Sequence, residues 1–130
     1  PYFRRRPETR LKFAAEGIAI VGEDQVPTGE IAGVGRFGDF TAGAALPETL
    51  IDHTYTGWNG YARIEDELGA IEIRSPNAPY LHVYARPGTD ILCLEPVTHL
   101  ADALNQNPAA MIALAPGAEA SLTMRISTSG

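Results

Sequence analysis

Two acidic residues occupy positions where a carboxylate could do chemistry, and Glu95 is the clearer of them. It directly follows the apolar run Ile91–Leu94 and precedes Pro96. A proline biases the preceding residue to an extended conformation and cannot donate to a sheet ladder, so we expect the strand to end or bulge here. A carboxylate held at a rigid strand end is suited to general acid–base chemistry. The alternative is a surface carboxylate at a strand terminus.

Asp52 is the second acidic candidate, and His53 follows it. An ionised aspartate only accepts hydrogen bonds, so it is suited to bind the hydroxyl groups of a ligand. The other interpretation is a turn aspartate that accepts from backbone N–H groups.

The three histidines are further acid–base candidates, because histidine titrates near neutral pH. His82 alternates with Leu81 and Val83, which predicts a place on the mixed face of a strand without a catalytic role. His99 lies shortly after Glu95 and is expected to be structural or a contact at the rim of a site. The sequence contains no CxxC pair, no HExxH motif and no glycine-rich phosphate loop.

Short alternating segments predict the strands that must position these residues. The 13 glycines and 10 prolines punctuate the chain every few residues, which is typical of a β-rich domain with many turns. Alternation predicts strands at 71–73, 80–84 and 121–126, and more weakly at 11–13, 18–21 and 61–64. The run 91–94 is apolar on both faces and predicts a central strand. A helical turn is expected at 98–104, and 42–50 is ambiguous. We predict an all-β fold, an antiparallel β-sandwich or part of one.

Composition limits the partners of the chain. Its 130 residues suffice for one domain, and a net charge of −6 opposes binding to nucleic acid. No apolar run approaches the roughly 20 residues of a membrane-spanning helix. The basic cluster Arg4–Arg6 is interpreted as a solvated segment or, alternatively, as an anion site. The single cysteine, Cys93, is expected to be a small buried residue, which is compatible with a cytoplasmic location.

Five segments of the sequence, in order, resemble the aldose 1-epimerase (galactose mutarotase) family. They are Pro1–Phe3, Pro27–Glu30 with Gly38–Phe40, Ile51–Trp58, Leu94–His99 with Asp102, Ala103 and Asn105, and Leu114–Glu119. Together they span nearly the whole chain, from Pro1 to about Ile126. Each motif is short, and their order carries the resemblance.

The resemblance implies an enzyme that interconverts the α and β anomers of a free aldohexose through the open-chain aldehyde, without metal or cofactor. It implies that Glu95 takes the proton of the anomeric hydroxyl and that Asp52 binds sugar hydroxyls. The acid implied by the family pattern is a histidine immediately before Pro1. The sequence departs from the family at His53, where a second aspartate is usual. Alternatives are a sugar-binding or regulatory protein without catalysis, and a hexose-phosphate mutarotase with Arg4–Arg6 near the phosphate.

Two aromatic residues are candidates for contact with such a sugar. Trp58 with Tyr55 could form an apolar platform, since aromatic rings stack on the C–H face of a pyranose; burial in the core is the alternative. The implied fold is a large antiparallel β-sandwich, in which residues 1–130 are a single domain or the C-terminal portion. We therefore expect association with an N-terminal part or self-association, and a monosaccharide as the ligand.

Overall fold

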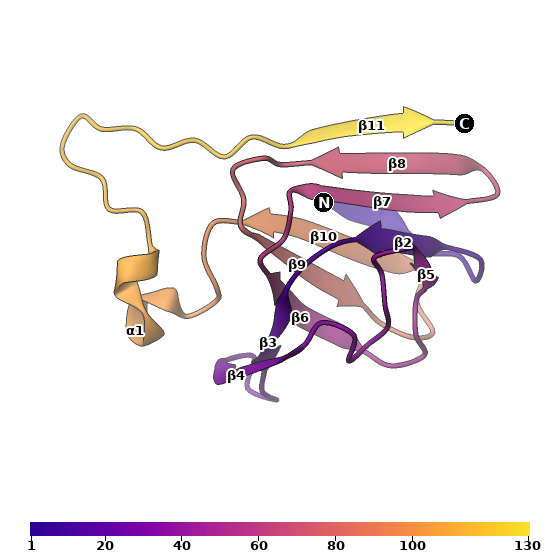
Figure 1. The fold of residues 1–130 in the computed structure, drawn as a ribbon, viewed down its shortest axis with the longest axis horizontal. Helices are drawn as coiled ribbons and strands as arrows, with labels where there is room; N and C mark the ends of the chain where they lie inside the picture. Colours follow the sequence, from indigo (N-terminus) through magenta and orange to yellow (C-terminus); the bar gives the residue numbers. More distant parts are fainter.

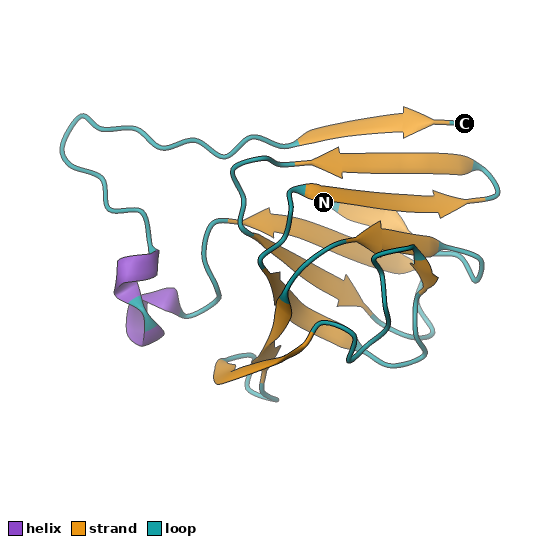
Figure 2. Ribbon diagram, viewed as in Figure 1, coloured by secondary structure: helices purple, strands orange, loops and turns teal.

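Eleven strands form two antiparallel sheets that face each other, as the computed structural model of residues 1–130 shows (Figures 1 and 2). The six-stranded sheet has the order β1 (Tyr2–Arg4), β10 (Ile91–Val97), β9 (Tyr80–Ala85), β6 (Ile51–Thr56), β3 (Gly17–Val21), β4 (Pro27–Gly33). The five-stranded sheet has the order β11 (Arg125–Ser129), β8 (Gly69–Arg74), β7 (Tyr61–Asp66), β2 (Arg10–Phe13), β5 (Ala44–Ala45). The predicted all-β sandwich is confirmed.

The core lies between the sheets because every second residue of the central strands is apolar. On β9, Leu81, Val83 and Ala85 are fully buried, while the residues between them are partly exposed. Across the core, Ile64 and Ile73 come from the five-stranded sheet. Each of these buried leucine, valine and isoleucine side chains contributes roughly 1.5–3 kcal/mol of hydrophobic stabilisation.

Strand β10 continues through Pro96, contrary to the expected end or bulge at Glu95. Pro96 pairs with Leu81 and Val97 with Tyr80, so the ladder with β9 is unbroken. The physical reason is the direction of the missing N–H. The N–H of Leu94 donates to the carbonyl of Pro1 on the β1 side, and the ring nitrogen of Pro96, two residues on, faces the same side. No hydrogen bond to β9 is lost.

The last strand begins later than alternation predicts. Strand β11 starts at Arg125, so 121–124 lies outside the ladder. This segment is held by side chains instead: Asn77 donates to the carbonyl of Ser121 and accepts from the N–H of Thr123, and the hydroxyl of Ser75 donates to the carbonyl of Thr123.

Helical structure is confined to the segment that connects β10 and β11 (Figure 2). It consists of α1 (Ala103–Gln106) and the 3₁₀ turn η1 (Pro108–Ala110). The sequence predicts a helical turn at 98–104, but the helix begins only at Ala103, near the end of that range. The ambiguous stretch 42–50 holds β5 and no helix. Neither helical segment is long and apolar enough to cross a membrane.

Candidate active site

The face of the six-stranded sheet that points away from the core, here called the outer face, carries the candidate chemistry. Glu95 on β10 pairs with His82 on β9, and His82 pairs with Thr54 on β6. Directly opposed residues of antiparallel strands project to the same side of the sheet. Because Leu81 and Val83 are buried in the core, the row Glu95, His82 and Thr54 lies on the outer face.

Glu95 is oriented by its own strand. Leu94 before it is fully buried, and Cys93 projects to the outer face with it. The Cys93 thiol donates to Oε1 of Glu95, with 3.1 Å between sulfur and oxygen. Burial, together with the neighbouring carboxylate, raises the pKa of this thiol to about 11. At neutral pH the thiol therefore keeps its proton and acts as a donor to Glu95.

Asp52 lies on the same outer face and is joined to His82. Its Oδ1 is 3.0 Å from Nε2 of His82, and Nδ1 of His82 is 2.8 Å from the Thr54 hydroxyl. The side chains of Asp52 and His82 are 23% and 25% exposed, which leaves both within reach of a ligand. Strands β6, β9 and β10 thus bring two carboxylates and a histidine together.

Two cavities open on this group, and Glu95 and His82 line both. One, of about 420 Å³, is also lined by Thr54, His99 and Leu122. The other, of about 380 Å³, is also lined by Tyr2, Asp52, Tyr84, Ile91 and Cys93. These volumes are in the range of small-molecule sites.

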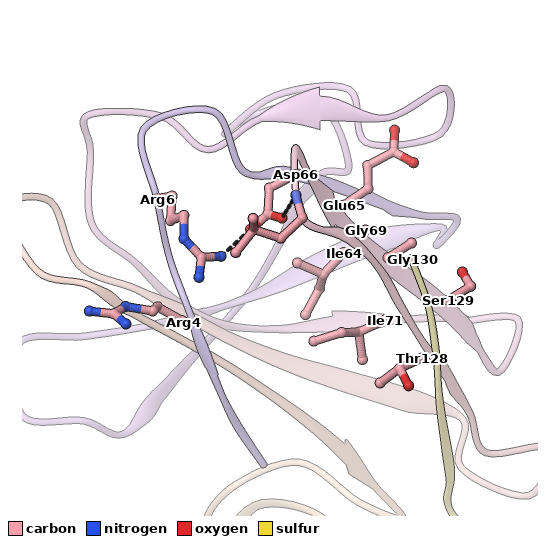
Figure 3. Close-up of a pocket in the computed structure, with 12 residues that line it drawn as sticks. Arg4, Arg6, Ile64, Glu65, Asp66, Gly69, Ile71, Thr128, Ser129 and Gly130 are labelled. Atoms are coloured by element: carbon pink, nitrogen blue, oxygen red, sulfur yellow. Dashed lines mark hydrogen bonds and ion pairs between the residues drawn. The ribbon is translucent and has the colours of Figure 1, made fainter.

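A third cavity, of about 420 Å³, lies by the β7–β8 turn and is lined by two arginines of the N-terminal cluster, Arg4 and Arg6 (Figure 3). Arg6 forms an ion pair with Asp66, and Arg4 lies 3.9 Å from Asp90. Arg5 donates to the carbonyls of Arg86 and Pro47. The cluster is thus paired with groups of the protein, and none of its residues lines the cavities at Glu95.

Comparison with known proteins decides the family. The model of the aldose 1-epimerase family matches residues 1–127. The chain belongs to the aldose 1-epimerase family. It is 30% identical over 128 residues to the uncharacterized protein YphB of Escherichia coli K12, covering 90% of this chain and 44% of that protein. Its structure is similar to the crystal structure of a candidate aldose 1-epimerase from Escherichia coli K12, with a TM-score of 0.79 and 30% identity.

This aldose 1-epimerase family chain spans less than half the length of the relatives it matches. The structural match includes 98% of this chain but only 48% of the chain in that crystal structure. The match to the family model includes both Asp52 and Glu95.

Two residues predicted to contact the sugar, Tyr55 and Trp58, are core residues. Tyr55 is fully buried and packs edge-to-face on Phe13, and Trp58 is 5% exposed with its indole N–H donating to the carbonyl of Tyr61. The predicted sugar platform is therefore corrected, because neither ring reaches the outer face. Tyr55 pairs with the core residue Leu81, which fixes its side chain on the inner side of the sheet.

The other histidines differ in their relation to the site. Nδ1 of His53 accepts from the N–H of Val21, its ring stacks on Phe37, and burial lowers its pKa. His99 lines a cavity with Glu95, in line with a rim position. Sequence reasoning missed the partnership of His82 with Asp52. The alternation placed His82 on the mixed face, but only the register of β6 against β9 brings the two together.

Proposed function

We propose that this chain supplies the base side of an aldose 1-epimerase site that interconverts the α and β anomers of a free aldohexose. The observation that carries the proposal is the joint placement of Glu95 and Asp52 in one cavity on the outer face, in a chain of this family. The reaction passes through the open-chain aldehyde and moves only protons.

Glu95 is the proposed base. Ring opening requires that the anomeric hydroxyl lose a proton while the ring oxygen gains one. Oε1 of Glu95 is occupied by the Cys93 thiol, and Oε2 makes no hydrogen bond within the protein. Oε2 is therefore the oxygen that takes the proton from the hydroxyl on C1. After rotation about the C1–C2 bond, the C5 hydroxyl attacks the opposite face of the aldehyde carbon and gives its proton back to the acid, while the Glu95 carboxyl group returns its proton to the carbonyl oxygen.

The register of β1 supports the proposed acid. Tyr2 pairs with Cys93, and the carbonyl of Pro1 accepts from the N–H of Leu94. If this antiparallel register continued, a residue immediately before Pro1 would lie opposite Glu95, with its side chain on the outer face. A histidine there, as the family resemblance implies, stands beside the base and protonates the ring oxygen.

Asp52 is the proposed binding group for the sugar. An ionised carboxylate accepts hydrogen bonds from the ring hydroxyls and fixes the sugar with C1 near Glu95. A hexose phosphate is a weaker candidate, because the arginine cluster is paired elsewhere.

The test is the approach to anomeric equilibrium of freshly dissolved α-glucose and α-galactose, followed by NMR with the complete gene product. Acceleration of either sugar above the buffer rate supports the proposal. Binding of a sugar without acceleration indicates a non-catalytic sugar-binding protein of the same fold. A protein that neither accelerates the exchange nor binds either sugar would contradict the proposal.

A further inference from the structure

His82 occupies the centre of the outer face, between the two carboxylates. Glu95 is its direct neighbour on β10, and on the opposite side β6 supplies Thr54 and Asp52. Residues 52 and 82 are far apart in the sequence, and the side-chain contact between them is at hydrogen-bond distance, 3.0 Å. His82 is the one group that lines both cavities of the site together with Glu95.

The hydrogen bonds of His82 fix its tautomer. An ionised Asp52 can only accept, so Nε2 of His82 carries a proton. In the neutral ring Nδ1 is then unprotonated and accepts from the Thr54 hydroxyl, 2.8 Å away. Thr54 is only 4% exposed, so its hydroxyl needs this partner.

Both ring nitrogens of neutral His82 are therefore engaged by the protein. No ring nitrogen is left to exchange a proton with a substrate, which separates His82 from the acid–base pair. Its effect must pass through Asp52. The Oδ1 of Asp52 is held by His82, whereas Oδ2 makes no hydrogen bond within the protein. Asp52 and Glu95 line the same cavity, so this second oxygen is available to a ligand there.

We infer that His82 is a positioning residue that holds one oxygen of Asp52 and thereby presents the other to a sugar hydroxyl beside Glu95. The inference rests on the proposed function, since it assigns to Asp52 the binding of the epimerase substrate. It predicts that His82 acts on substrate binding through its Nε2–H donor.

The test compares His82→Leu with His82→Gln in the complete gene product, using α-glucose and α-galactose. Leucine removes the donor, and glutamine places an amide N–H near the position of Nε2. His82→Leu removes the N–H that donates to the Asp52 carboxylate. Because a hydrogen bond to a charged group is lost, KM is expected to rise about 10-fold or more, with a much smaller change in kcat. His82→Gln is expected to recover most of this loss. Tyr80→Leu, on the same strand and face, is the matched control and is expected to keep the parent KM.

A spectroscopic readout accompanies the kinetics and does not depend on activity. The ¹⁵N shifts of the neutral His82 ring are expected to show the Nε2–H tautomer in the parent, and this preference is expected to be lost in Asp52→Ala. An Nδ1–H tautomer in the parent overturns the inference.

The kinetic outcomes distinguish the inference from the proposed function. If the parent accelerates anomer exchange and His82→Leu keeps the parent KM, the inference fails and the proposed function stands. If His82→Gln is as impaired as His82→Leu, the donor role fails. A parent that accelerates neither sugar overturns the proposed function and this inference with it.

Discussion

At the scale of single residues, Cys93 links the stability of the fold to pH. Its thiol is 2% exposed and has a pKa raised from 9.0 to about 11, so the fold favours the protonated form. The unfolded chain releases this proton near pH 9 and the folded protein near pH 11. The contribution of the thiol to stability is therefore fully present below about pH 9 and is lost as the pH rises to about 11.

The measurement is the free energy of unfolding by urea for the parent and for Cys93→Ala, as a function of pH. Alanine does not titrate, and all other groups are shared, so the difference isolates the thiol. We expect a constant difference below pH 9 and a decreasing advantage of the parent between about pH 9 and pH 11. A difference that stays flat across that interval would contradict the burial argument.

The sequence predicted some of these residues and missed others for a physical reason. The position of Glu95 after an apolar run was readable locally, and the outer-face placement of His82 followed from alternation. The contact of His82 with Asp52 depends on the register between β6 and β9, which no local pattern specifies. The inward direction of Tyr55 depends on the same register.

At the scale of elements, the β7–β8 hairpin supports the edge strand β11. Gly69 begins β8 with φ 134°, and a Cβ atom on it would overlap the carbonyl oxygen of Ser129. Replacement by alanine thus combines backbone strain with displacement of the end of β11. We expect Gly69→Ala to reduce the free energy of unfolding by roughly 1–3 kcal/mol or more.

Gly88, in the turn between β9 and β10, is the matched control for this prediction. Its φ is 72°, but an added Cβ has no neighbour within 4 Å, so Gly88→Ala introduces the strain alone. Denaturant unfolding of both variants is expected to show the smaller loss for Gly88→Ala, roughly 1–2 kcal/mol. Equal losses would show that the contact with Ser129 does not matter.

Element predictions succeeded where strands follow alternation and failed where side chains hold the backbone. The alternating residues of β8 and β9 were recognisable because one face packs on the core. The segment 121–124 alternates equally well but is held by Asn77 and Ser75 instead of a ladder. Pro96 was misleading, because its missing N–H faces away from β9.

At the scale of the whole molecule, the C-terminal edge is unusually open. Strand β11 pairs only with β8 and lies at the edge of its sheet (Figure 1). Ile126 on this strand is 43% exposed, and Leu122 and Met124 in the segment just before it are 45% and 42% exposed. An unpaired strand edge with apolar side chains is a template for association.

We therefore expect residues 1–130, expressed alone, to associate or to be poorly soluble, as light scattering after size-exclusion chromatography would show. Ile126→Lys should reduce association, because a lysine on an edge strand opposes pairing. Leu68→Lys, which alters a residue 68% exposed in the β7–β8 turn, should have little effect. A soluble monomer with cooperative unfolding would contradict this prediction.

The central claim, that Glu95 is the base of an epimerase site, is tested most directly by Glu95→Gln in the complete gene product. The measurement is the NMR rate of anomer exchange of α-glucose and α-galactose, beside the parent and the control Glu30→Gln, whose carboxylate forms an exposed ion pair on β4. We predict that Glu95→Gln lowers kcat by roughly 100-fold to 10,000-fold while Glu30→Gln keeps the parent rate. An active parent whose rate survives in Glu95→Gln would contradict the claim.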